Sequence, residues 1–135
     1  MDNVWIYLKY FVAITGGFMT ALLGGWDMVL KALVVLVVLD YVTGVTAAWF
    51  EKKLSSEVGA KGIAKKILLF VPVVIGVYMD QATGQQVFRS LAIWFYMANE
   101  GLSCLENLGR VGIPFPEAMK KALVQLKDKE ESTNA

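Results

Sequence analysis

The chain has 135 residues, of which 56% are hydrophobic and 19% are charged, and its formal net charge is +1. Soluble domains are about 45–50% apolar and about 25% charged, so this composition favours a membrane protein. The small net charge argues against nucleic-acid binding through a basic surface, and the absence of histidine removes the commonest general base and metal ligand. The single cysteine, Cys104, excludes an intrachain disulfide and a zinc cluster.

Two long apolar segments at the start of the chain predict a helical hairpin. The first runs from Val4 to Leu23, with Lys9 near one end, where a long side chain can reach the lipid headgroups. The second runs from Met28 to Phe50 and as a helix is about 34 Å long, enough to cross a hydrocarbon core of about 30 Å. Glycines and Asp27 between the two segments predict a tight turn.

A polar, lysine-rich stretch from Glu51 to Lys66 follows and is predicted to be a loop. Its five lysines are Lys52, Lys53, Lys61, Lys65 and Lys66. An excess of lysine and arginine marks cytoplasmic loops, whereas acidic residues count little against it. With two crossings on either side of this loop, both termini are predicted to be cytoplasmic.

The third and fourth segments are less typical of membrane spans. The third, from Ile67 to Met79, is short, and Pro72 predicts a kink in it. The fourth, from Val87 to Leu108, is amphipathic and can span only if its polar face meets protein or water.

Pro114 and Pro116 then introduce a last helix with a charged tail. The predicted fold is all-α: an integral membrane protein with four transmembrane helices, or three if the first segment lies along the membrane surface. We assign residues 1–113 to a helical transmembrane domain. Residues 114–135 are predicted to be a short cytoplasmic amphipathic helix and its tail.

Small residues recur at intervals of four and predict close helix packing. Gly17, Ala21 and Gly25 are spaced four apart, from the first segment into the turn that follows it, and Gly44 and Ala48 repeat the spacing in the second segment. Small side chains let two backbones approach closely, which favours helix association in lipid. The spacing fits packing within one chain and packing between chains about equally well.

Asp40 is the sharpest single feature of the sequence. It lies in the middle of the most apolar segment, where a carboxylate costs about 2.5–3.5 kcal/mol on insertion scales. Such a residue is predicted to face protein or a water-filled space. A functional role and a structural hydrogen bond to a neighbouring helix, with Thr43 taking part, both account for it.

The polar residues of the fourth segment form a second set of candidates, namely Asn99, Glu100, Ser103, Glu106 and Asn107. A pore lining or a hydrogen-bonded face between subunits suits them better than a paired-carboxylate hydrolase, because no partner base or substrate pocket is indicated. Arg89 lies about three turns from Glu100, too far to pair with it, so it is predicted to pair with another helix or another subunit. No phosphate loop, nucleophile elbow or metal-ligand spacing occurs, so we predict no catalytic residue, metal or cofactor.

The order and spacing of several motifs resemble bacteriophage holins of the toxin-secretion and phage-lysis group, over roughly residues 31 to 125. The motifs are Asp40-Tyr41-Val42-Thr43-Gly44, Leu54-Ser55-Ser56, Gly59 to Gly62, Lys65-Lys66, Asn99-Glu100-Gly101-Leu102-Ser103, Glu106-Asn107 and Gly112-Ile113-Pro114-Phe115-Pro116.

The resemblance implies a small helical protein of the bacterial (host) cytoplasmic membrane that forms homo-oligomers in the lipid bilayer. Their lesions would release a cell-wall hydrolase, the endolysin, or a secreted toxin. It implies no enzyme activity and no direct contact with the endolysin. Two other functions fit the sequence: a small ion channel or transporter, and a non-conducting accessory subunit (antiholin).

Overall fold

The computed structural model describes residues 2–134, which form six helices and no strand. The helices are α1 (Asp2–Leu22), α2 (Met28–Phe50), α3 (Ser56–Leu68), α4 (Val71–Thr83), α5 (Phe88–Val111) and α6 (Glu117–Asn134).

Three stretches within these residues are long and apolar enough to cross a membrane. They are Asn3–Leu22 in α1, Met28–Phe50 in α2, and Ser56–Thr83, which comprises α3 and α4 together. The prediction of an all-α membrane protein is therefore confirmed with three candidate spans. α5 falls outside this set because polar and charged side chains recur along it.

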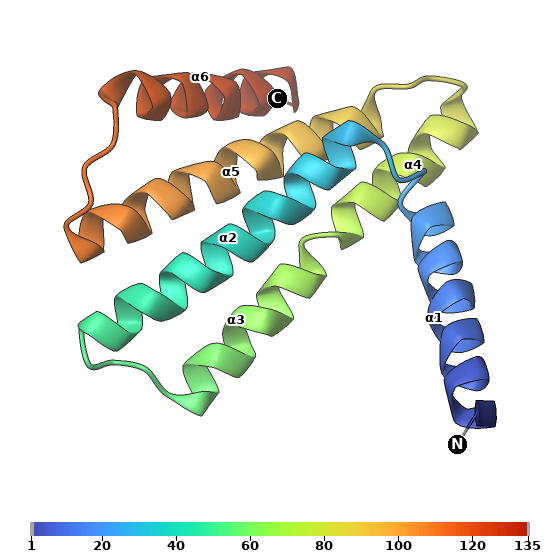
Figure 1. Ribbon diagram of the computed structural model, residues 1–135. Coiled ribbons are helices and arrows are strands. Elements are labelled where there is room, and N and C mark those ends of the chain that lie inside the picture. Colours follow the sequence, from blue (N-terminus) through green and yellow to red (C-terminus); the bar gives the residue numbers. More distant parts are fainter. Residues whose placement is uncertain (1, 135) are drawn as a thin grey trace.

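The helices other than α1 lie side by side in a layered bundle (Figure 1). α5 packs against α2 and α4 on one side, and α6 runs back along another side of α5. The largest fully buried side chains are those of Leu30, Leu33, Val73 and Ile93, which come from α2, α4 and α5. α5 is therefore the central element through which the other helices are connected.

The prediction of a loop from Glu51 to Lys66 is wrong, because most of this stretch is the helix α3. Ser55 caps the helix: its hydroxyl oxygen accepts a hydrogen bond from the backbone N–H of Val58 at 3.2 Å. In the first turns, Glu57 and Lys61 form an ion pair of 2.7 Å one helical turn apart. Local capping and charge pairing outweighed the polar composition on which the loop prediction rested.

The kink predicted at Pro72 is confirmed as a break between α3 and α4. Leu69 and Phe70 lie between the two helices, and Pro72 stands in the first turn of α4. A proline is tolerated there because the first N–H groups of a helix have no partner within the helix. The break lets one candidate span consist of two helices, each of 13 residues.

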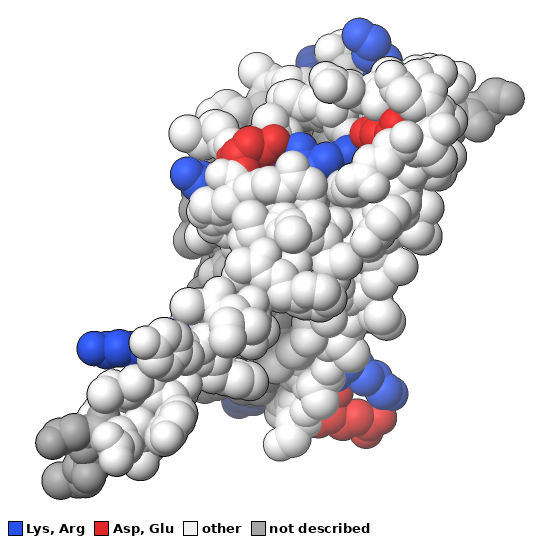
Figure 2. Space-filling model, turned by 90° about the vertical axis from the view of Figure 1, so that its right-hand side faces the viewer, with Lys and Arg blue, Asp and Glu red and all other residues white. Residues whose placement is uncertain are grey.

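One face of the bundle carries its charged side chains near the two ends (Figure 2). On the face in Figure 2, acidic and basic side chains gather at two levels, and a broad uncharged surface separates them. The turns from α1 to α2 and from α4 to α5 lie at one end of the bundle, and the connection from α2 to α3 lies at the other (Figure 1). The uncharged surface between them can face hydrocarbon without burying a charge in it.

The helix α1 projects away from the bundle and buries none of the side chains in its span (Figure 1). Trp5, Tyr10 and Phe11 are 63%, 64% and 68% exposed. A Cβ atom added at Gly17 would meet nothing within 4 Å, and Ala21 is exposed. In this structure the small residues of α1 therefore pack against nothing in their own chain.

Arg89 joins the start of α5 to the turn between α1 and α2. Its guanidinium donates hydrogen bonds to the carbonyl oxygens of Leu23, at 2.7 Å, and Gly25, at 3.1 Å, and it forms an ion pair of 2.7 Å with Asp27. The hydrogen bonds from Arg89 lower the pKa of the Asp27 carboxyl below its ordinary value. Gly24 and Gly25 have φ values of 81° and 111°, a conformation that favours glycine, so Gly25 serves the turn. The predicted pairing of Arg89 with another segment is confirmed, within one chain.

The carboxylate of Asp80, at the end of α4, holds the first turn of α5. It accepts backbone hydrogen bonds from Val87, Phe88 and Arg89 at 3.0, 2.8 and 3.1 Å. These are N–H groups that a helix leaves without internal partners, and a negative charge is favourable at a helix N-terminus. Together Asp80 and Arg89 connect the turn between α1 and α2, the end of α4 and the start of α5.

Replacing Arg89 with alanine is expected to lower the free energy of unfolding by about 1.5–3 kcal/mol, because two carbonyl groups and one carboxylate lose a charged donor. Unfolding of the purified protein in mild detergent, followed by circular dichroism, measures this loss. The matched control is Arg110→Ala, which removes an arginine paired with Glu51 at a more exposed site and is expected to cost about 1 kcal/mol or less. Equal losses in the two variants would contradict the role given to Arg89.

Candidate functional site

A polar cluster lies inside the bundle, where α2, α3 and α5 meet. Its charged members are Asp40 from α2, Lys66 from α3 and Glu100 from α5. Asp40 is 8% exposed and Glu100 is 3% exposed, so both carboxylates are shielded from solvent. The Lys66 ammonium forms ion pairs with both of them, with Asp40 through Oδ2 and with Glu100 through Oε2. One lysine thus connects two carboxylates that are 60 positions apart in the sequence.

Asn107 extends the cluster from the next turns of α5. Its Nδ2 donates to Oδ1 of Asp40 at 2.8 Å, to the Asp40 carbonyl at 3.1 Å and to Oγ1 of Thr43 at 3.0 Å. The Thr43 hydroxyl donates in turn to the carbonyl oxygen of Leu39 at 2.7 Å. Asp40 therefore has both an ionic partner and a hydrogen-bond partner, as a buried carboxylate requires.

Small residues of α2 make room for these contacts. A Cβ atom at Gly44 would lie 3.4 Å from Nδ2 of Asn107, at the close limit of ordinary van der Waals contact. Ala48, one turn further on, is 7% exposed and is packed within this chain. At this helix pair the spacing of four brings α2 and α5 of one chain together.

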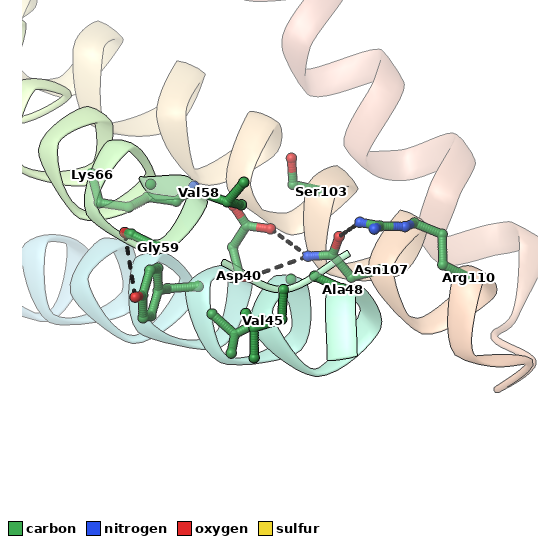
Figure 3. Close-up of a pocket in the computed structure, with 13 residues that line it drawn as sticks. Asp40, Val45, Ala48, Val58, Gly59, Lys66, Ser103, Asn107 and Arg110 are labelled. Carbon is green, nitrogen blue, oxygen red and sulfur yellow. Dashed lines mark hydrogen bonds and ion pairs between the residues drawn. The ribbon is translucent and has the colours of Figure 1, made fainter. Parts of the chain in front are cut away.

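A pocket of about 310 Å³ opens beside the cluster (Figure 3). Its lining includes Asp40, Lys66, Ser103, Asn107 and Arg110, and Figure 3 shows Asn107 between Asp40 and Arg110. Arg110 donates to Oδ1 of Asn107 at 3.2 Å and forms two hydrogen bonds of 2.9 Å with Glu51. Those bonds lower the pKa of the Glu51 carboxyl. The pocket lies beside the buried charges, between them and the pair at the end of α2.

The cluster contains two carboxyl groups and one ammonium group. With both carboxyl groups ionised, Asp40 and Glu100 carry two negative charges, and Lys66 carries one positive charge. Arg110, the other cation near the pocket, is paired with Glu51. An unbalanced charge is costly in a medium of low dielectric constant, so the cluster is stable only as far as water or protein dipoles compensate it.

The structure brings together five of the eight predicted polar or pore candidates, places a sixth in the adjoining pocket, and leaves the other two outside. Asp40, Thr43, Gly44, Glu100 and Asn107 belong to the cluster or touch it. Ser103 lines the pocket, whereas Asn99 is half-buried and Glu106 is exposed. The polar side of α5 is therefore not one continuous stripe.

Lys66 was not among the predicted site residues. It was predicted to end a loop, although it lies 26 positions after Asp40 and contacts it from the next helix. Its position at the start of an apolar segment was the one available signal, and Lys65 shares that position.

The fold and the cluster define a class of small helical membrane protein whose buried charges pair within the chain. The model of the bacteriophage holin family matches residues 17–128, so the chain belongs to the bacteriophage holin family. Membership of this family indicates a membrane protein that is not an enzyme.

Two relatives illustrate the range of similar proteins. An uncharacterized 14.9 kDa protein in the nagH 3′ region of Clostridium perfringens is 40% identical over 131 residues, which cover 96% of this chain and 99% of that protein. A probable holin of Bacillus phage phi105 is 35% identical over 95 residues, 70% of each chain. No solved structure has a significant match to the chain.

Proposed function

We propose that this protein is a holin that assembles with copies of itself in the bacterial cytoplasmic membrane. The resulting lesions release a cell-wall hydrolase, and so lyse the host, or release a secreted toxin. Membership of the holin family supports the general role. The observation that carries the finer proposal is a buried cluster of two carboxyl groups, Asp40 and Glu100, around one cation, Lys66, in a chain with three candidate spans.

The cluster gives a physical reason for a delay followed by opening. In a single subunit the polar groups of the cluster are paired inward, so these groups present no polar surface to hydrocarbon. With both carboxyls ionised, the cluster carries one excess negative charge, which destabilises this closed state. Assembly that admits water beside Glu100 and Asp40 relieves the excess charge, and the pocket beside the cluster is the path by which water reaches it.

The helix α1 supplies a surface for assembly. Its small residues, Gly17 and Ala21, are open in the single chain and allow a close approach of a second copy. Gly44 lies against Asn107 of α5 and Ala48 is buried within one chain, so we assign contacts between copies to α1.

We further propose a topology with both termini in the cytoplasm. The end of the bundle that carries Lys52 and Lys53, beside Lys61, would be cytoplasmic because lysine-rich connections remain on that side. α5 would form the fourth crossing, with its polar side against α2 and α3. The final helix then follows from the cytoplasmic end of α5.

Induction of the chain in growing bacteria tests the proposal. Viability and membrane potential are expected to collapse abruptly after a lag, because opening follows assembly and not synthesis. Steady growth with the protein present in the membrane would contradict a holin and favour the accessory role. Discrete, ion-selective conductance of the purified protein, without release of large dyes, would favour a channel.

A further inference from the structure

The position of α6 places a charged helix at the depth of the membrane spans. α6 runs back along α5 from the carboxyl end of that helix (Figure 1). Its Leu123 lies against Gly101, the residue next to Glu100, so the middle of α6 is level with the buried ion cluster. The α6 side chains that point away from α5, among them Lys120, Lys121 and Asp128, are exposed.

The contact between α6 and α5 is specific and shallow. A Cβ atom at Gly101 would lie 3.1 Å from both methyl groups of Leu123. The missing side chain at Gly101 therefore leaves the space that Leu123 occupies, and we call this contact the seat. Near the connection from α5 to α6, the Phe115 ring lies 3.7 Å from where a Cβ atom at Gly109 would be. Val124 and Leu126 remain 38% exposed, so only one narrow side of α6 is covered.

Lipid cannot surround α6 in this position. Its exposed lysines and Asp128 would lie in hydrocarbon, where ionised side chains are tolerated only against protein or water. A subunit surrounded by lipid must therefore release α6 into the cytoplasm. The docked arrangement requires water on the side of α5 that carries α6.

We propose that α6 docks on α5 in the assembled lesion and lines its water-filled lumen. This inference rests on the proposed function, because it requires that the copies enclose water. α5 then forms the second layer of the wall, with its ion cluster toward α2 and α3 and its Gly101 face under α6. The charged side chains of α6, and not those of α5, face the lumen.

A disulfide between the two helices tests this arrangement. The full-length variant Gly101→Cys, Leu123→Cys, Cys104→Ser places two cysteines at the seat, where the Gly101 Cβ position is 3.8 Å from the Leu123 Cγ atom. It is reconstituted in calcein-loaded vesicles of phosphatidylethanolamine and phosphatidylglycerol. The matched control carries Val124→Cys in place of Leu123→Cys and is expected to remain a dithiol.

The disulfide is expected to form, and the oxidised variant is expected to release calcein as fast as the reduced one. If the disulfide does not form, or if oxidation abolishes release, the lumen position of α6 is wrong. Release by the reduced variant in the same experiment still supports the proposed function. No release from either form contradicts the proposed function, and this inference falls with it.

A fluorescent label distinguishes an α6 that lines the lumen from an α6 that lies elsewhere and does not affect release. Asp128→Cys is added to the oxidised variant and labelled with bimane after the disulfide has closed. Aqueous iodide is expected to quench the label, whereas spin labels on lipid chains are expected to leave its fluorescence unchanged. The comparison is Phe11→Cys in α1, which lipid spin labels are expected to quench; the same quenching at position 128 overturns the proposal.

Discussion

Replacing Lys66 with methionine is expected to lower the free energy of unfolding by about 3–5 kcal/mol, the usual cost of removing one partner from a buried ion pair. The variant leaves the carboxylates of Asp40 and Glu100, which are 8% and 3% exposed, without their shared cation. Titration of the detergent-solubilised protein with sodium dodecyl sulfate, followed by tryptophan fluorescence, measures the loss.

Two further variants make this result specific to the charge. Lys65→Met removes the exposed lysine next in the chain and is expected to change stability by about 0.5 kcal/mol or less. Combining Lys66→Met with Asp40→Asn and Glu100→Gln removes all the charges of the cluster and is expected to restore most of the stability. If Lys66→Met and Lys65→Met unfold at the same concentration of sodium dodecyl sulfate, the cluster does not hold the three helices together.

Replacing Glu100 with glutamine is expected to stabilise the closed subunit and so to delay lysis in induced cells. The substitution keeps an acceptor for Lys66 and leaves a one-to-one pair with Asp40, so the closed subunit loses its unbalanced charge. A stabilisation of about 1.4 kcal/mol lowers the open fraction about tenfold at a given concentration. The time from induction to loss of membrane potential, at equal protein levels, is the measurement.

The matched control for timing is Glu57→Gln, which removes a glutamate paired with Lys61 at the surface. Both side chains of that pair are more than 70% exposed, at 75% and 72%, so neutralising Glu57 leaves the interior unchanged. Unchanged or earlier lysis in Glu100→Gln, beside unchanged timing in Glu57→Gln, would show that the excess charge does not drive opening.

The two expectations separate stability from function. Loss of Lys66 and loss of Glu100 remove opposite charges from one cluster, so an explanation by disturbed packing alone predicts the same direction for both. The electrostatic explanation predicts destabilisation for one and delay for the other. The cluster is thus tested as a charge balance and not only as a set of contacts.

Local signals in the sequence were sufficient for α2 and for the break before α4, but not for α3. The apolar run from Met28 to Phe50 predicted α2 with the bounds that the structure has, because hydropathy over a full span depends on no distant partner. Pro72 predicted the break before α4 for the same reason. The stretch from Glu51 to Lys66 was misread, since its composition is polar and the cap at Ser55 is a weaker signal than five lysines.

The partners of the charged groups were decided by tertiary structure alone. Asp40 was recognisable as a residue that needs a partner, but Lys66 and Asn107 reach it from 26 and 67 positions away. Arg89 likewise meets Leu23 across 66 positions. Helical spacing relates residues within a few turns, whereas packing sets which helix faces which; the sequence therefore determined that the charges must be paired, and the bundle determined with what.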